Sequence, residues 1–238
     1  MSMKKIAFYV EGQTEMFFLE KLITEIAGQK NIQIELQEFG GKGRPKKTIH
    51  PKITTKVQNP QHYALLFNCT SDMGVKSRIL EDASSLFSQN YSEIIGLMDL
   101  FPRTDLAKLE KSLIEGRERL NERIIPPLPA KTSIVIAVRE IEDWFLAECN
   151  HYFHIDNLLN DALISASALN FNPRTDDLTT RSCAAAEDLK LIYQLVGKSY
   201  DKDIKKVLRT INCLDYSNLY SNIRTKIPKL NELVMNCK

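Results

Sequence analysis

The stretch FYVEGQTEMFFLEKL, residues 8–22, decides the fold, because an apolar strand here passes directly into a helix. Residues 4–10 are short, apolar and rich in strand-favouring types, which predicts a buried strand. Gly12 interrupts this run, and residues 14–27 carry apolar side chains at helical spacing. Glu11 therefore stands where the strand ends and the helix begins. A carboxylate at that point either caps the helix or belongs to a functional site.

The same alternation continues to about residue 150. We predict further strands at residues 32–39, 62–69, 93–101 and 133–139, and helices at 77–89 and 105–122. Strands that alternate with helices predict an α/β fold, Rossmann-like, with a mostly parallel sheet covered by helices on both faces. Beyond residue 150 the pattern is helical. We therefore expect an α/β domain at 1–150 and a helical C-terminal segment at 151–238 packed on it.

Composition is that of an ordinary globular protein. The chain has 238 residues, 43% apolar content and a formal charge of +2, so the overall charge favours no class of partner. Its five cysteines are scattered and have no zinc-site spacing, which favours reduced thiols. The apolar run at the N-terminus is too short for a signal peptide or a membrane span. We expect a cytoplasmic protein with no membrane partner.

Acidic residues follow three of the predicted strands. Glu11 ends the first strand, Asp99 ends the strand at 93–99, and Glu140 and Glu142 follow the strand at 133–139. Ligands of open α/β sheets bind beyond the carboxyl ends of the strands, so these side chains can meet. Oxygen ligands suit Mg²⁺ or Mn²⁺, and a pair of such ions can clamp a phosphodiester. Asp105 is a further candidate ligand.

Glu140 and Glu142 lie two residues apart, so their secondary structure matters. On a strand they share a face, whereas on a helix they diverge. We expect both to reach one site only if the strand continues through Ile141; otherwise one of them is a surface acid. Asp143 is more typical of a cap for the helix that follows.

Residues 40–56, GGKGRPKKTIHPKITTK, contain many basic residues and no acid. Glycine and proline interrupt the stretch, which predicts a basic loop. Lys42, Arg44, Lys46 and Lys47 can each neutralise a phosphate of a nucleic-acid backbone. The alternative is an ordinary solvated loop. The glycines here lack P-loop spacing, so no ATP site is predicted.

Three motifs resemble those of the Toprim superfamily. They are VEGQTE at 10–15, LMDLFP at 97–102 and REIEDWFLA at 139–147. The closest resemblance is to a family of small bacterial Toprim-like proteins related to the RloB group and to the OLD (overcoming lysogenization defect) nucleases. Its motifs read Val-Glu-Gly-x-Thr-Glu and His-Glu-Phe-Glu-Ala, and the resemblance covers roughly residues 4–150.

The resemblance implies a Toprim-like fold and a set of site residues. Glu11 matches the proton-handling or metal-binding acid, Asp99 the first acid of the Toprim Asp-x-Asp pair, and Glu140 and Glu142 the acids of the last motif. Glu11, Asp99 and Glu142 would then be catalytic. The chain departs from the pattern in two places. Phe101 stands where the second aspartate belongs, and Arg139 replaces the histidine before Glu140.

The function implied by the resemblance is a Mg²⁺- or Mn²⁺-dependent nuclease that acts on DNA or RNA phosphodiesters. Its setting would be bacterial anti-phage defence, beside a separate ATPase subunit. The alternative is a non-catalytic Toprim-derived subunit that binds nucleic acid or a partner protein, and Phe101 favours this alternative. The sequence predicts no oligomeric state.

Overall fold

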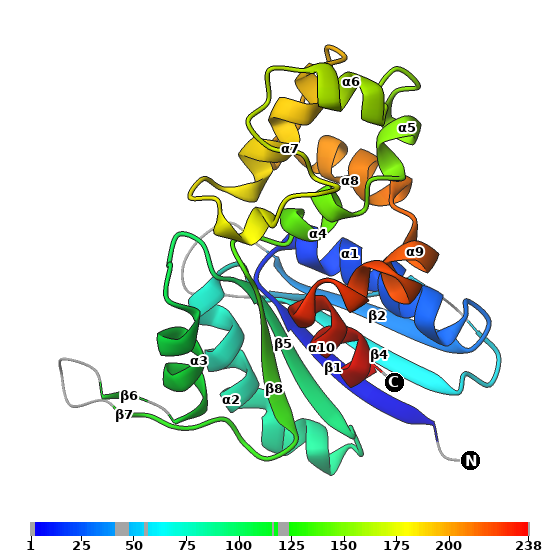
Figure 1. Ribbon diagram of the computed structural model, residues 1–238. Helices are drawn as coiled ribbons and strands as arrows, with labels where there is room; N and C mark the ends of the chain where they lie inside the picture. The colour runs from blue at the N-terminus through cyan, green and yellow to red at the C-terminus, as the bar shows by residue number, and fades with distance from the viewer. Residues whose placement is uncertain (1–2, 41–47, 55–56, 116, 119–123, 238) are drawn as a thin grey trace. The chain divides into compact units, whose positions relative to one another are not determined.

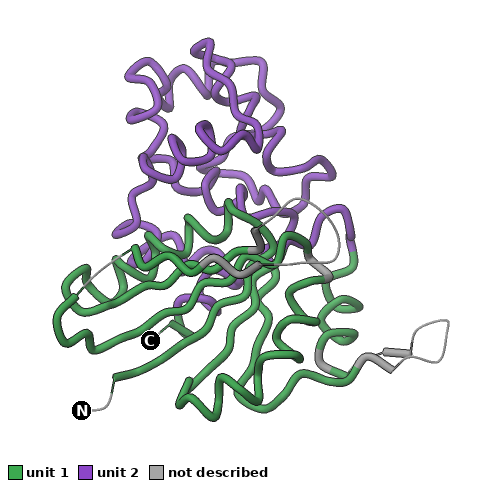
Figure 2. The backbone as a smooth tube through the Cα atoms, turned by 180° about the vertical axis from the view of Figure 1, so that it is seen from behind, with its two compact units in different colours: residues 1–98, 105–136, 235–238 green, residues 99–104, 137–234 purple. Residues whose placement is uncertain are grey.

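The computed structural model describes residues 3–40, 48–54, 57–115, 117–118 and 124–237. The chain forms two compact units (Figure 2). Unit 1 comprises residues 1–98, 105–136 and 235–238, and unit 2 comprises residues 99–104 and 137–234. Unit 2 therefore begins before residue 151 and includes the last of the three acidic motifs, which the sequence-based division placed in the first domain.

A six-stranded sheet forms the centre of unit 1 (Figure 1), and only the last residues of two of its strands, Asp99 and Ala137, are assigned to unit 2. Its strands are β1 (Lys4–Val10), β2 (Ile32–Gly40), β3 (Thr48–Ile53), β4 (His62–Asn68), β5 (Glu93–Asp99) and β8 (Thr132–Ala137). The strand order is β3-β2-β4-β1-β5-β8. β1, β2, β4 and β5 pair in parallel, and β3 is antiparallel to β2. The predicted mostly parallel α/β sheet is thus confirmed.

Helices cover both faces of this sheet. The helices of unit 1 are α1 (Gln13–Ala27), α2 (Asp72–Ser88) and α3 (Leu106–Ile114). Ile6 and Phe8 of β1 line one small apolar cavity with Ile23 of α1. The hydroxyl group of Tyr9 instead donates a hydrogen bond of 2.8 Å to Asp82 of α2. Alternate residues of β1 therefore face opposite sides of the sheet, with α1 on one side and α2 on the other.

Two helix boundaries differ from the sequence-based prediction. α2 begins at Asp72 rather than at residue 77, because Ser71 Oγ accepts a hydrogen bond from the Gly74 N–H and caps the helix. α3 ends at Ile114 rather than at residue 122. The ammonium group of Lys76 accounts for this end, since it donates to the carbonyl oxygens of Ser112 and Leu113 in the last turn.

The basic stretch is also not a loop throughout. Residues 48–53 form β3, whose register pairs Gly40 with Thr48 and Glu35 with Ile53. The unpaired edge of β2 supplies hydrogen-bonding partners that the sequence of the stretch alone does not show. A second, two-stranded sheet is formed by β6 (Arg117–Glu118) and β7 (Ile124–Ile125), and β6 lies where the prediction had continued the preceding helix.

Unit 2 is helical. Its helices are α4 (Glu142–Ala147), α5 (His151–Ile155), α6 (Asp161–Ala166), α7 (Ala185–Gln194), α8 (Ile204–Cys213), α9 (Tyr216–Ser221) and most of α10 (Pro228–Cys237), with 3₁₀ turns at Leu178–Thr180 and Ile223–Thr225. α4 packs against α7, and α5 against α8. No described residue after β8 belongs to a strand, as predicted. None of the helices that the structure describes combines the length and apolar character needed to cross a membrane.

Candidate metal centre

The chain turns sharply between β8 and α4. β8 ends at Ala137, Arg139 has a φ of 63°, and α4 begins at Glu142. A positive φ is uncommon for a residue with a side chain, and it reverses the course of the backbone here. Glu140 and Glu142 therefore lie in a tight turn rather than on a continued strand. The expectation that both acids could meet only on a strand was wrong, because this turn directs both side chains to one place.

The Arg139 side chain holds this turn. It is buried, and its guanidinium group donates to the carbonyl oxygens of Leu178 at 2.8 Å and Cys183 at 2.9 Å. It also pairs with Asp143 at 3.0 Å and with Asp188 at 2.7 Å. The planar, five-donor guanidinium group suits such a multiple contact, which a histidine could not make.

Asp143 pairs with Arg139 instead of capping the helix. The N-cap position of α4 is Ile141, and no side chain caps it, so the prediction that Asp143 is a cap was wrong. Burial raises the pKa of Asp143 to about 7, and the charge of Arg139 opposes this rise. Its second oxygen, Oδ2, is buried without a hydrogen-bond partner among the described residues.

Asp99, Glu140 and Glu142 come together, and we call these three residues the acidic cluster. Each offers one oxygen that lies within 4.8 Å of the others, and all three are buried. Asp99 ends β5, and the turn that bears the two glutamates follows β8, the neighbouring strand. The cluster thus forms at the carboxyl ends of adjacent strands, where α/β sheets bind ligands.

Each carboxylate of the cluster is anchored through one oxygen. The anchoring bonds, each 2.9 Å long, run from Ile141 N–H to Oδ1 of Asp99, from Ala186 N–H to Oε2 of Glu140, and from the Tyr200 hydroxyl to Oε1 of Glu142. Oε2 of Glu142 is buried and has no hydrogen-bond partner within the described part of the chain. An unsatisfied buried acceptor costs about 1–3 kcal/mol, so this oxygen could accept a hydrogen bond or bind a cation.

Lys202 faces all three members of the acidic cluster. Its Nζ lies 3.0 Å from Oε1 of Glu140 and 4.0 Å from both Oδ2 of Asp99 and Oε1 of Glu142. Burial lowers the pKa of this lysine, but the three carboxylates outweigh that effect and raise the pKa above its ordinary value. Burial raises the pKa of Glu142; the nearby charge of Lys202 opposes this rise, and the carboxylate of Glu140 adds to it.

Glu11 and Asp105 belong to unit 1. Glu11 follows β1, and its N–H donates to the carbonyl oxygen of Leu97. Gly12, not Glu11, is the N-cap residue of α1. Asp105 caps α3, since its Oδ1 accepts a 2.9 Å hydrogen bond from the Lys108 N–H. Metal binding by either acid stays a prediction.

The remaining residues singled out in the sequence are Phe101 and four basic residues of the stretch 40–56. Phe101 is exposed. Lys42, Arg44, Lys46 and Lys47 lie outside the described residues, so their predicted contact with nucleic acid is not addressed by the structure.

Sequence reasoning missed Tyr200 and Lys202. Both come from the segment between α7 and α8, and both side chains contact the acidic cluster. Asp201 between them pairs instead with Lys206 at 2.5 Å. The only sequence signal is the alternation in Tyr-Asp-Lys-Asp, which by itself does not indicate a site.

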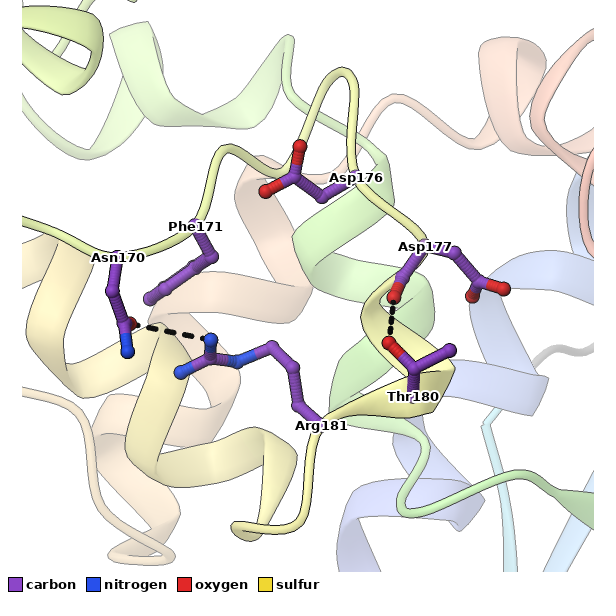
Figure 3. A pocket seen from close by; sticks show the side chains of 6 residues that line it. All are labelled: Asn170, Phe171, Asp176, Asp177, Thr180 and Arg181. Carbon is purple, nitrogen blue, oxygen red and sulfur yellow. Dashed lines mark hydrogen bonds between the residues drawn. The ribbon is translucent and has the colours of Figure 1, made fainter.

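A second polar cavity lies elsewhere in unit 2 (Figure 3). It has a volume of about 400 Å³ and is lined by Asn170, Phe171, Asp176, Asp177, Thr180 and Arg181. The guanidinium group of Arg181 is already engaged, since it hydrogen-bonds Asn170 and Asp188 and stacks over the Phe171 ring. We therefore assign no ligand to this cavity.

No protein-family model, curated protein sequence or solved structure significantly matches the chain. The geometry of the acidic cluster is therefore the main guide to function.

Proposed function

We propose that the acidic cluster is a divalent metal centre and that the chain is a Toprim nuclease-like protein that hydrolyses phosphodiesters of DNA or RNA. One observation carries the proposal. Three carboxylates are buried side by side, and Oε2 of Glu142, the most deeply buried of the three acids, has no hydrogen-bond partner among the residues that the structure describes. Such an arrangement is costly unless a cation or a proton relieves the repulsion.

The donor set fits Mg²⁺ or Mn²⁺. All its members are carboxylates, and Mg²⁺ is usually bound through one or two carboxylates and several waters. Anchoring leaves Oδ2 of Asp99, Oε1 of Glu140 and Oε2 of Glu142 as the oxygens not used by the three anchoring bonds. When bound, the ion would supply an activated water and polarise the phosphate.

The chain itself orients the three carboxylates and excludes water from around them. The backbone donors of Ile141 and Ala186 and the Tyr200 hydroxyl fix the carboxylates, and such anchoring typically changes metal affinity 10–100-fold. Burial keeps the surroundings of the carboxylates dry, which strengthens their attraction for a cation.

Two further parts of the proposal rest on the resemblance to Toprim proteins and on the sequence. Glu11 would be an additional acid of the site, and Lys42, Arg44, Lys46 and Lys47 would bind the nucleic-acid backbone. The setting would be anti-phage defence in bacteria, with an ATPase as a separate subunit.

The test is cleavage of supercoiled plasmid and of RNA by the purified chain with Mg²⁺, with Mn²⁺ and with a chelator. Asp99→Asn and Glu142→Gln remove ligand charge with little change of shape, and we expect each to reduce cleavage about 100-fold or more. Glu187→Gln is the matched control, because Glu187 is an exposed acid of the same unit paired with Lys190. Cleavage that persists in the chelator, or that both cluster variants retain, would refute metal-dependent hydrolysis at the acidic cluster, and no cleavage with either metal would refute the nuclease assignment.

A second function is favoured by Lys202. Its ammonium group contacts all three carboxylates and partly neutralises them without a metal. Together with Phe101, this favours a non-catalytic Toprim-derived subunit that binds nucleic acid or a partner protein. The distinguishing result is nucleic-acid binding that occurs without cleavage and that Glu142→Gln leaves unchanged.

A further inference from the structure

We propose that Lys202 is a displaceable counter-ion of the acidic cluster: its ammonium group and a divalent cation compete for the same carboxylate oxygens, so this lysine sets the metal affinity of the site. The inference rests on the proposed metal centre and adds its regulation. It does not depend on the reaction that the centre performs.

First, Lys202 contacts carboxylate oxygens of Asp99 and Glu140 that the anchoring bonds leave unused. Lys202 lies closest to Oε1 of Glu140 and also approaches Oδ2 of Asp99. The backbone donors of Ile141 and Ala186 hold the opposite oxygen of each of these carboxylates. The lysine therefore occupies the oxygens that a metal would need.

The second step is electrostatic. An ammonium group at these oxygens and a divalent ion bound to them would lie within a few ångströms of each other, and like charges at that separation in a buried site repel strongly. The two cations therefore exclude each other. A divalent ion also brings two positive charges to the acidic cluster, whereas the ammonium group brings one, so it compensates the carboxylates better.

Third, the Lys202 side chain can move away from the cluster more easily than the carboxylates can. The Lys202 side chain is 51% exposed, whereas the side chains of Asp99, Glu140 and Glu142 are only 6%, 8% and 0% exposed. The lysine stem has four flexible carbons and ends in a compact, strongly hydrated group. Lys202 can thus withdraw into water while the anchored carboxylates stay in place.

The fourth step concerns Glu142. The lysine contacts Oε1 of Glu142, which already accepts the Tyr200 hydrogen bond, while Oε2 has no hydrogen-bond partner in the described part of the chain. The ammonium group therefore does not complete the site. A permanent structural ion pair would be expected to satisfy the most buried acceptor, whereas a temporary occupant need not.

The experiment is calorimetric titration of the full chain with Mn²⁺. Lys202→Met keeps the length of the side chain and removes the charge. We expect its Kd for Mn²⁺ to be about tenfold lower than that of the wild type, or lower still, where tenfold corresponds to about 1.4 kcal/mol. Lys202→Arg keeps a cation at the site and should not tighten binding. Lys206→Met is the matched control, because Lys206 pairs with Asp201 and is not among the contacts of the cluster.

The outcomes separate the two proposals. Equal or weaker Mn²⁺ binding by Lys202→Met, with binding by the wild type, would overturn the competition and leave the metal centre intact. Absence of Mn²⁺ binding in both would overturn both proposals. Tighter binding in Lys202→Met without nuclease activity would support the competition and refute only the reaction.

Thermal unfolding tests the same competition if Lys202→Met is too unstable for calorimetric titration. In chelator, Lys202→Met should have a lower Tm than the wild type, because three acids are then buried without a cation. Mn²⁺ should raise its Tm by more than it raises that of the wild type. A smaller or equal rise would contradict the competition.

Discussion

The Tyr200 hydroxyl donates a 2.9 Å hydrogen bond to Oε1 of Glu142, across 58 residues of sequence, and both side chains are almost completely buried. The bond fixes the carboxylate of the least exposed acid in the cluster. Because one oxygen is held by Tyr200, the other is free to serve a ligand. Tyr200 is therefore a positioning residue of the proposed metal centre.

Removal of this hydroxyl should weaken metal binding. In Tyr200→Phe, Glu142 loses its orienting donor, and we expect the Kd for Mn²⁺ to rise about tenfold. The free energy of unfolding should fall by about 1–2 kcal/mol, because an oxygen of Glu142 loses a buried partner. Calorimetric titration and urea unfolding measure the two effects.

Tyr193→Phe is the control for this prediction. Tyr193 is equally buried in the same unit and contacts His151 and Thr210 through its hydroxyl group. Its loss should lower stability without a change in Mn²⁺ affinity. If both variants weaken Mn²⁺ binding equally, Tyr200 acts through stability alone.

Replacement of Arg139 should destabilise the protein strongly. Arg139→Met leaves two buried carboxylates, Asp143 and Asp188, without this cation, and breaking a buried pair typically costs about 3–5 kcal/mol. Arg139→Lys keeps the charge but loses the fork of donors, so its loss should be smaller. Urea unfolding at pH 7 measures both, and a loss below 1 kcal/mol for the methionine variant would contradict the role given to Arg139.

Glu148 should make stability depend on acid pH. Burial raises its pKa, but hydrogen bonds from His151, Asn218 and Asp215 outweigh burial and lower the pKa below its ordinary value of 4.5. A carboxyl group with a lowered pKa in the folded state stabilises the fold above its ordinary pKa, and this contribution is lost as the pH falls through the folded value.

Glu148→Gln therefore tests the direction of this shift. The variant should be less stable than the wild type at pH 7 by about 1–3 kcal/mol. Its free energy of unfolding should fall less steeply between pH 6 and pH 3, since the glutamine does not titrate. Parallel pH profiles of the two proteins would show that the pKa of Glu148 is not lowered.

The basic stretch should govern affinity for nucleic acid. We expect replacement of Lys42, Arg44, Lys46 and Lys47 by alanine to weaken binding of DNA and RNA of any sequence and to reduce the salt dependence of the binding constant. Mn²⁺ affinity should be unchanged, because these residues are not part of the acidic cluster. Fluorescence anisotropy at several salt concentrations measures the slope, and an unchanged slope would favour the solvated-loop alternative.

Local sequence patterns predicted most of the sheet. The strands at 4–10, 32–39 and 62–69 match the structure to within one residue at each end. They are short, apolar and bounded by turn residues, so their conformation depends little on distant parts of the chain. The errors fall where a distant partner decides the outcome: Lys76 ends α3, and β2 pairs with β3 in the basic stretch.

The sequence by itself determined the α/β class and placed Asp99, Glu140 and Glu142 after the ends of strands, because hydrophobic periodicity is a local property of the chain. Tertiary structure alone decided that both glutamates meet, that Arg139 fixes their turn, and that Tyr200 and Lys202 contact the acidic cluster. The physical reason is that these contacts join distant residues, 44 positions apart for Arg139 and Cys183 and 62 for Lys202 and Glu140, and no local pattern records which distant donor will satisfy a buried charge.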